Sequence, residues 1–105
     1  PLKYDANDHN LPGGTVSVGK TIEEDAIDKV KDKTGIIVSN LNYLCNIKES
    51  RYNVHIYYTS EWSGDIGDFI DYSVSWKPLE VLLDTKRWKD ANKIIFDKLK
   101  VIDNL

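Results

Sequence analysis

The sequence predicts a single α/β domain over residues 1–105, and three observations support this fold class. Two stretches rich in β-branched and aromatic residues, 36–47 and 52–62, are typical of strands. Two stretches, 22–34 and 88–102, place apolar residues at helical spacing. A length of 105 residues, 41% of them hydrophobic and 30% charged, fits one ordinary globular domain.

Charge and cysteine content exclude several classes of protein. The net charge of −3 disfavours general nucleic-acid binding. Cys45 is the one cysteine, so the chain cannot form an internal disulfide, and its apolar surroundings predict a small buried residue. No segment resembles a signal peptide or a membrane span, and we therefore expect a cytoplasmic protein.

The first half of the chain carries clear helix signals. Residues 15–18 alternate polar and apolar side chains, which predicts a short strand. Thr21 is a good N-cap, and Glu24 three residues later completes a capping box. Gly35 is expected to end the helix, after two lysines in the last turn. The side of this helix that faces the core is predicted to carry Ile22, Ala26, Ile27 and Val30.

The second half is expected to hold a loop, a strand and two helical segments. Residues 63–71 are rich in glycine and aspartate, which is typical of a loop. Residues 72–76 alternate and predict a third strand, and 77–84 predict a short helical turn around Pro78. The final helix is predicted to bury one stripe of side chains, Trp88, Ala91, Ile95, Leu99 and Ile102.

Residues 14–21 read G-x-x-x-x-G-K-T and so match the phosphate-binding P-loop pattern. A P-loop needs a buried strand directly before its first glycine, whereas the polar residues 1–12 predict no strand. Val16 and Val18 are β-branched, and such residues resist the positive φ angles of a phosphate-binding loop. We therefore reject ATP or GTP binding through this motif.

The segment "LPGGTVSVGKTIEEDAIDKVKDKTGI", residues 11–36, resembles the signature of the Nudix family. A second segment, "SVSWKPLEVL", resembles the tryptophan-proline-leucine region of that family, so the resemblance covers about residues 11–100. It implies a mixed β-sheet with flanking helices. The matched scaffold positions are Pro12, Gly13, Gly14, Gly19, Thr21, Ala26, Val30, Gly35 and Ile36.

Compared with the Nudix pattern, the chain reads as either an N-terminally truncated fragment or a minimal Nudix-like fold with an exposed sheet edge. Nudix domains carry strands before the glycine turn, but only twelve residues precede Gly13, and none of them reads as a strand. Missing strands would expose a sheet edge and apolar surface, which favours pairing with another chain. We therefore expect either a partner protein or a homodimer.

The catalytic letters of the signature are replaced. Nudix hydrolases hold magnesium through glutamates of this helix, whereas this chain has Lys20, Asp28-Lys29 and Asp32-Lys33 at those positions. A lysine ammonium has no lone pair and cannot ligate a metal ion. The resemblance therefore implies a domain without catalytic residues, metal or cofactor.

Three interpretations of the altered helix face stay open. Asp25, Lys29, Asp32 and Lys33 share this face, and Asp25 to Lys29 is a favourable i,i+4 pair, so the face could be solvated and carry weak ion pairs. Alternatively, lysines could hold an anion in place of the lost cation, through Lys20, Lys29 and Lys33. A third interpretation is a rebuilt metal site made of Asp28 and Asp32 with Glu61, Asp65, Asp68 or Asp71.

Histidines and tryptophans supply the remaining candidates. His9 is expected at the surface, and His55 is expected to be a hydrogen-bonded histidine of a sheet. Trp76 and Trp88 lie in core-like patterns. Trp62, beside the glycine-rich loop, is the tryptophan expected to be exposed for binding a base or a partner.

These observations favour a non-catalytic binding or interaction module that engages a partner protein or a phosphate-containing ligand such as a nucleotide. The composition also suits a phage or mobile-element protein that acts on a host factor. The alternative is a divalent-metal-dependent pyrophosphohydrolase, acting on linked nucleoside diphosphates, with a rebuilt metal site. The expected ligand-binding residues are Lys20, Lys29, Asp32, Lys33 and Trp62.

Overall fold

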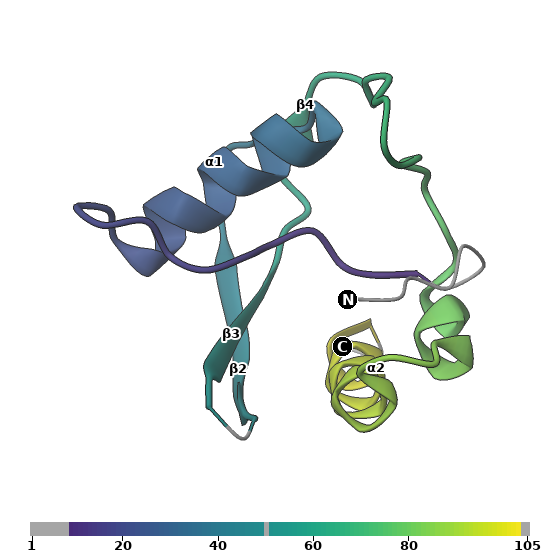
Figure 1. Cartoon of the computed structure of the whole chain (residues 1–105). Helices are drawn as coiled ribbons and strands as arrows, with labels where there is room; N and C mark the ends of the chain where they lie inside the picture. The colour runs from purple at the N-terminus through teal and green to yellow at the C-terminus, as the bar shows by residue number, and fades with distance from the viewer. Residues whose placement is uncertain (1–8, 50, 104–105) are drawn as a thin grey trace.

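A computed structural model of the chain describes residues 9–49 and 51–103. It confirms a small α/β domain, in which helices accompany short strands (Figure 1). The elements in chain order are α1 (Ile22–Thr34), β1 (Ile37–Val38), β2 (Asn42–Lys48), β3 (Asn53–Tyr58), β4 (Trp62–Ser63), the 3-10 helix η1 (Leu79–Asp84) and α2 (Lys89–Asp103).

The strands form two separate two-stranded sheets, and both are antiparallel. The expectation of one mixed sheet is therefore wrong for the described residues. The predicted strand 36–47 is interrupted at residues 39–41, so that β1 pairs with β4 while β2 pairs with β3. At the interruption the Ser39 N–H donates to the Glu61 carbonyl (2.8 Å), and the Thr59 hydroxyl donates to the Asn40 carbonyl (2.5 Å).

The main core lies between the β2–β3 hairpin, η1 and α2. Cys45 and Ile47 of β2 contact Ile95 of α2 within one buried cluster. The buried position of Cys45 is confirmed, and burial raises the pKa of its thiol. The partly buried side chains around the cluster are Leu44, Val54, Ile56, Leu79, Phe96 and Leu99.

Helix α1 begins and ends as predicted. The Thr21 hydroxyl accepts the Glu24 N–H (3.1 Å), while the Glu24 carboxylate accepts the Thr21 N–H, so both halves of the capping box are present. Gly35 is the C-cap, in the left-handed region at φ 87°. The helix packs against β1, whose Val38 is buried together with Ile36.

The buried side chains of α1 differ from the predicted ones. Asp25 and Thr34 are the buried residues of this helix, at 2% and 8% exposure. The apolar stripe that begins at Ile22 is only partly buried. Asp25 therefore does not lie on a solvated face, which corrects the first interpretation of that face. It is buried because its carboxylate has hydrogen-bond partners at the helix surface, described below.

Two predicted strands are absent. Residues 15–18 are irregular, and the Ser17 N–H donates to the carboxylate of Asp25 (3.1 Å) and not to a neighbouring strand. Residues 72–76 are irregular, with Val74 partly buried and Tyr72 and Trp76 exposed, and no described segment forms a backbone ladder with them. In both cases a correct side-chain pattern lacks the neighbouring strand that a sheet requires.

The C-terminal helical segments agree with prediction except at the tryptophans. η1 follows Pro78, and α2 buries Ala91 and Ile95 of the predicted stripe. Trp88 lies just before α2 at φ 60°, 44% exposed, and Trp76 is 64% exposed, so the expectation that both belong to the core is wrong. No helix among residues 9–49 and 51–103 is long and apolar enough to cross a membrane.

Candidate functional site

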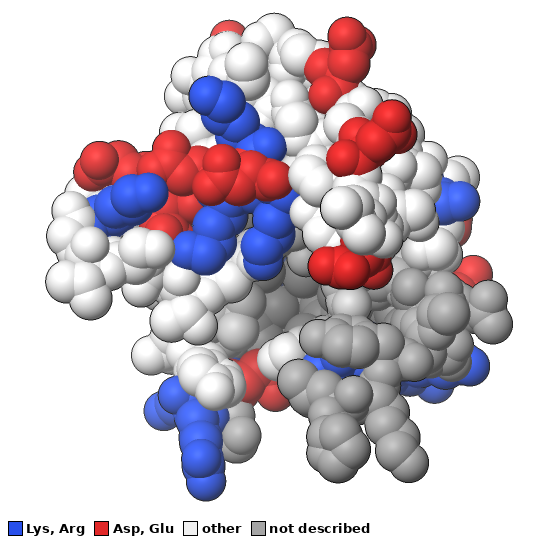
Figure 2. Space-filling view, turned by 45° about the horizontal axis from the view of Figure 1, so that its top comes forward, with Lys and Arg blue, Asp and Glu red and all other residues white. Residues whose placement is uncertain are grey.

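Lysines and carboxylates alternate along α1, and Figure 2 shows them interleaved on one face of the molecule. Lys20 Nζ lies 2.7 Å from Asp28 Oδ2, and both side chains of this pair are half-exposed. Its hydrogen bond to Asp28 raises the pKa of Lys20. Lys29 Nζ lies 2.5 Å from Asp25 Oδ2, which confirms the predicted i,i+4 pair.

Asp25 joins the loop of residues 13–20 to α1. One carboxylate oxygen accepts the Ser17 N–H (3.1 Å), and the other accepts the Lys29 ammonium. Lys29 also donates to the Ser17 hydroxyl (3.4 Å). Chiefly because of the Lys29 hydrogen bond, the pKa of Asp25 falls from 3.8 to about 2. This carboxylate is therefore ionised at neutral pH and holds the loop.

Lys33 makes a second link to the same loop, by donating to the Gly13 carbonyl. A Cβ atom on Gly14 would lie 2.9 Å from Lys29 Cε and 3.5 Å from Lys33 Nζ, so the loop runs directly over both lysines. The structure thus brings Lys29 and Lys33 together. Each of the three predicted anion-binding lysines has an oxygen of the chain itself as partner.

The carboxylates that were predicted to form a rebuilt metal site do not cluster in the structure. No three His, Cys, Asp or Glu side chains are placed to hold a metal ion anywhere in the described part of the chain. Asp28 is engaged with Lys20, and Asp32 is exposed on α1. The acidic side chains of 61–71 belong to another segment, which follows β3.

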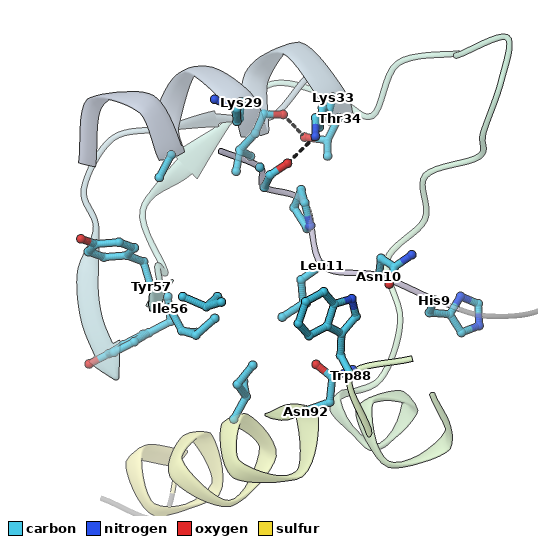
Figure 3. Close-up of a pocket in the computed structure, with 18 of the residues that line it drawn as sticks. His9, Asn10, Leu11, Lys29, Lys33, Thr34, Ile56, Tyr57, Trp88 and Asn92 are labelled. Carbon is cyan, nitrogen blue, oxygen red and sulfur yellow. Dashed lines mark hydrogen bonds between the residues drawn. The ribbon is translucent and has the colours of Figure 1, made fainter. Parts of the chain in front are cut away.

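A central cavity of about 1530 Å³ is lined by side chains of α1, β3, η1 and α2 and of the segments that connect them. Figure 3 shows Lys29, Lys33 and Thr34 above it, Ile56 and Tyr57 beside it, and Asn92 below it, with Leu11 and Trp88 between. Its lining is mostly apolar, contributed by side chains such as Leu11, Val16, Val30, Val54, Ile56, Val74, Leu79 and Ile95. Lys29, Lys33 and Trp62 belong to the lining, whereas Lys20 and Asp32 do not.

Strand β3 presents its free edge to the central cavity. All six residues of β3 line it, on both faces of the strand, whereas Ile47 alone represents β2. β3 pairs with β2 on one side, and no other described segment pairs with it on the other. Sequence pattern could not identify this edge, because Asn53–Tyr58 reads equally well as an inner or an outer strand.

Trp62 and Trp76 form a surface pair, named here the tryptophan pair. Their ring centroids lie 4.9 Å apart, and 46% and 64% of the two residues is exposed. Both residues line the central cavity. The predicted exposure of Trp62 is confirmed, whereas Trp76 was missed because its alternating neighbours suggested a buried strand.

The outer face of the hairpin holds a small polar and aromatic group. The Tyr43 hydroxyl lies 3.3 Å from His55 Nδ1, which confirms a hydrogen-bonded sheet histidine. The Tyr57 hydroxyl donates to Glu23 of α1 (2.9 Å), and burial, followed by this bond, raises the pKa of Tyr57 to about 12. These contacts connect α1 to β3. His9 is exposed, as predicted.

Comparisons with known protein families, with curated proteins and with solved structures find no match for this chain. The Nudix resemblance therefore stays a prediction from the sequence, and the function has to be argued from the geometry of the site.

Proposed function

We propose that this protein is a non-catalytic interaction module whose central cavity receives an extended segment of a partner protein. One observation carries the proposal: the edge of β3 opposite β2, with which no described segment pairs, borders a large, mostly apolar cavity. A partner segment would add a strand to β3 through backbone hydrogen bonds and would place alternate side chains against the cavity wall.

The edge of β3 is suited to such pairing. Its sequence, NVHIYY, contains no proline, glycine, lysine or carboxylate, the residues by which proteins usually guard an exposed edge. Six residues offer about 20 Å of backbone, enough to align a short peptide. An unpaired apolar edge of this kind is a ready template for another strand.

The dimensions and the lining of the central cavity favour a polypeptide over a small molecule. Small-molecule pockets usually measure roughly 300–1,000 Å³, and this cavity of about 1530 Å³ is larger. The three lysines expected to bind phosphate already have partners within the chain. A partner protein is therefore better supported than a nucleotide.

Selection of peptides from a random twelve-residue display library tests the proposal directly. The matched variants are Val16→Asp and Val18→Asp, which place the same new charge two residues apart. Val16 lines the central cavity, whereas Val18 lies outside its lining and is fully exposed. Peptides selected on the wild type should bind the Val18→Asp variant as tightly as the wild type. They should not bind the Val16→Asp variant.

Hydrogen exchange of the complex with one selected peptide then locates the contact. We expect the amides of β3 to become protected on binding, since edge amides gain partners only when a strand is added. Selected peptides that bind both variants equally, or that leave exchange of β3 unchanged, would contradict the proposal.

A further inference from the structure

Asn92 is a buried polar residue on the side of α2 that carries the core. It is 6% exposed, and it lies in the first turns of the helix between the buried residues Ala91 and Ile95. Asn92 lines the central cavity, and Figure 3 shows it on the α2 side of that cavity. Burying a polar group is costly unless its atoms have hydrogen-bond partners. Each end of this carboxamide therefore requires an explanation.

The NH₂ group of Asn92 has a partner within the fold. It donates to the Thr85 hydroxyl oxygen (2.8 Å), and that hydroxyl donates in turn to the Leu82 carbonyl (3.1 Å). Because the only hydroxyl proton of Thr85 goes to Leu82, the Thr85 oxygen can only accept from Asn92. The NH₂ group therefore faces Thr85, and the carboxamide oxygen faces away from it.

The carboxamide oxygen of Asn92 has no hydrogen bond with any described residue. No fully buried side-chain oxygen or nitrogen in the described part of the chain lacks a partner, so this oxygen is not sealed inside the fold. Since Asn92 lines the central cavity, the oxygen is reached from that cavity. A fixed acceptor in a mostly apolar wall is typical of a group that orients a ligand, and the bond to Thr85 does not account for it.

A strand added to β3 would require an acceptor of this kind. In an extended segment every second residue pairs with the neighbouring strand, while the residues between them direct their N–H groups to the opposite side. Those outward N–H groups would enter a mostly apolar cavity, where a donor without a partner is costly. β3 lines the cavity on one side, and Asn92 lines it from α2 (Figure 3).

We infer that the carboxamide oxygen of Asn92 accepts a hydrogen bond from one outward-facing backbone N–H of the partner segment. This inference rests on the proposed function and adds a recognition residue to it: β3 pairs with one edge of the segment, and Asn92 binds the other. Recognition of a backbone group requires no particular side chain. It excludes proline at that one position, because proline has no N–H.

Amide-to-ester substitution in a peptide selected on the wild type tests the inference, because it removes one N–H and keeps every side chain. Each amide is replaced in turn, and calorimetry measures binding to the wild type and to Asn92→Leu. Leucine is similar in size and removes the oxygen, while the Thr85 hydroxyl can still donate to Leu82. We expect one outward-facing ester to weaken binding to the wild type at least about five-fold and binding to Asn92→Leu less than about two-fold.

Three controls accompany this comparison. Esters at the positions that pair with β3 should weaken binding to both proteins equally, since those N–H groups do not meet Asn92. Asn92→Ala is a second variant without the oxygen and should respond to the esters as Asn92→Leu does; thermal melting checks that both are folded. Asn46→Ala alters an exposed asparagine of β2 outside the cavity lining and should respond as the wild type does.

The outcomes separate this inference from the proposed function. If esters at alternate positions weaken binding but none of their effects depends on Asn92, strand addition stands and the inference is overturned. If both Asn92 variants weaken the parent peptide and every ester by the same factor, Asn92 has only a structural role, and the inference is again overturned. If no ester weakens binding, the segment does not bind through its backbone, and the proposed function fails together with the inference.

Discussion

The ammonium of Lys29 lies 2.5 Å from the carboxylate of Asp25, and this pair holds the loop of residues 13–20 against α1. Asp25 is 2% exposed and also accepts the Ser17 N–H. Lys29, which the sequence resemblance would place at a metal-binding position, is thus part of a structural link. This relationship changes what substitutions in the region should do.

Acid stability should depend on Asp25. The folded-state pKa of this carboxyl lies below its ordinary 3.8, at about 2. Its contribution to stability is therefore complete above about pH 4 and is lost as the pH falls toward 2. We expect Asp25→Asn to lower the Tm at pH 7, with a difference from wild type that shrinks from pH 4 to pH 2. Calorimetry across this range measures it, and a difference that does not vary with pH would exclude this role.

The two lysine pairs of α1 should differ in their importance. Lys29 and Asp25 have 19% and 3% exposed side chains, whereas Lys20 and Asp28 have 42% and 49%. Solvent and salt screen the exposed pair strongly. We expect Lys29→Ala to lower the Tm clearly and Lys20→Ala to leave it nearly unchanged. Similar melting of the two variants would show that the Asp25 link is no stronger than a surface ion pair.

The Asp25–Lys29 pair limits which lysine can be used to test anion binding by charge reversal. A Lys29→Glu substitution would place a second carboxylate against buried Asp25 and should destabilise the fold. Lys33, which donates only to the Gly13 carbonyl among its described contacts, is the better position for a charge reversal. A nucleotide titration of Lys33→Glu, with EDTA present, tests phosphate binding while keeping the Asp25 link.

Gly35 should be intolerant of any side chain. It has a φ of 87°, and a Cβ atom there would lie 2.5 Å from the Asp65 carbonyl oxygen and 3.0 Å from the Gly67 nitrogen. Both contacts are backbone atoms, so the loop after β4 would have to move. We expect Gly35→Ala to destabilise the protein by about 1–3 kcal/mol.

The matched control for this substitution is Gly13→Ala. A Cβ on Gly13 meets no atom within 4 Å, and its φ is not in the positive range. We expect a change of at most about 0.5 kcal/mol. Urea unfolding of both variants gives the comparison, and equal free energies of unfolding would show that the approach of Asp65 to Gly35 is not constrained.

The helix from Thr21 to Gly35 could be predicted because its signals are local. The capping box, the run of helix formers and the C-cap glycine each depend only on residues that are neighbours in the sequence. The choice of strand partner is a long-range matter. Residues 36–47 carry one continuous β pattern, yet Ser39 bonds to Glu61 and divides the segment between two sheets.

The candidate site was predictable only in part, for the same reason. Sequence spacing identifies the Asp25–Lys29 pair, but the burial of Asp25 depends on Ser17, which comes from an irregular loop. Trp62 stands out beside glycine and acidic residues, whereas Trp76 shares the alternation of a strand. Its place beside Trp62 follows from how residues 64–75 return to β4, and no local pattern records this path.

The last prediction concerns catalysis. Lys20, Lys29 and Lys33 each contact an oxygen of the chain, and no group of carboxylates in the described part of the chain is placed to hold a divalent ion. We therefore expect no Mg²⁺- or Mn²⁺-dependent hydrolysis of nucleoside di- or triphosphates, nucleotide sugars or dinucleotides. Phosphate release at high protein concentration is the measurement, with Asp32→Ala as the control, since Asp32 retains a carboxylate at a signature position. Metal-dependent turnover that disappears in Asp32→Ala would identify the protein as a pyrophosphohydrolase with a rebuilt site. Turnover that persists in the control would point instead to a contaminating enzyme. Gel filtration tests this, because the activity of a contaminant would elute apart from the protein.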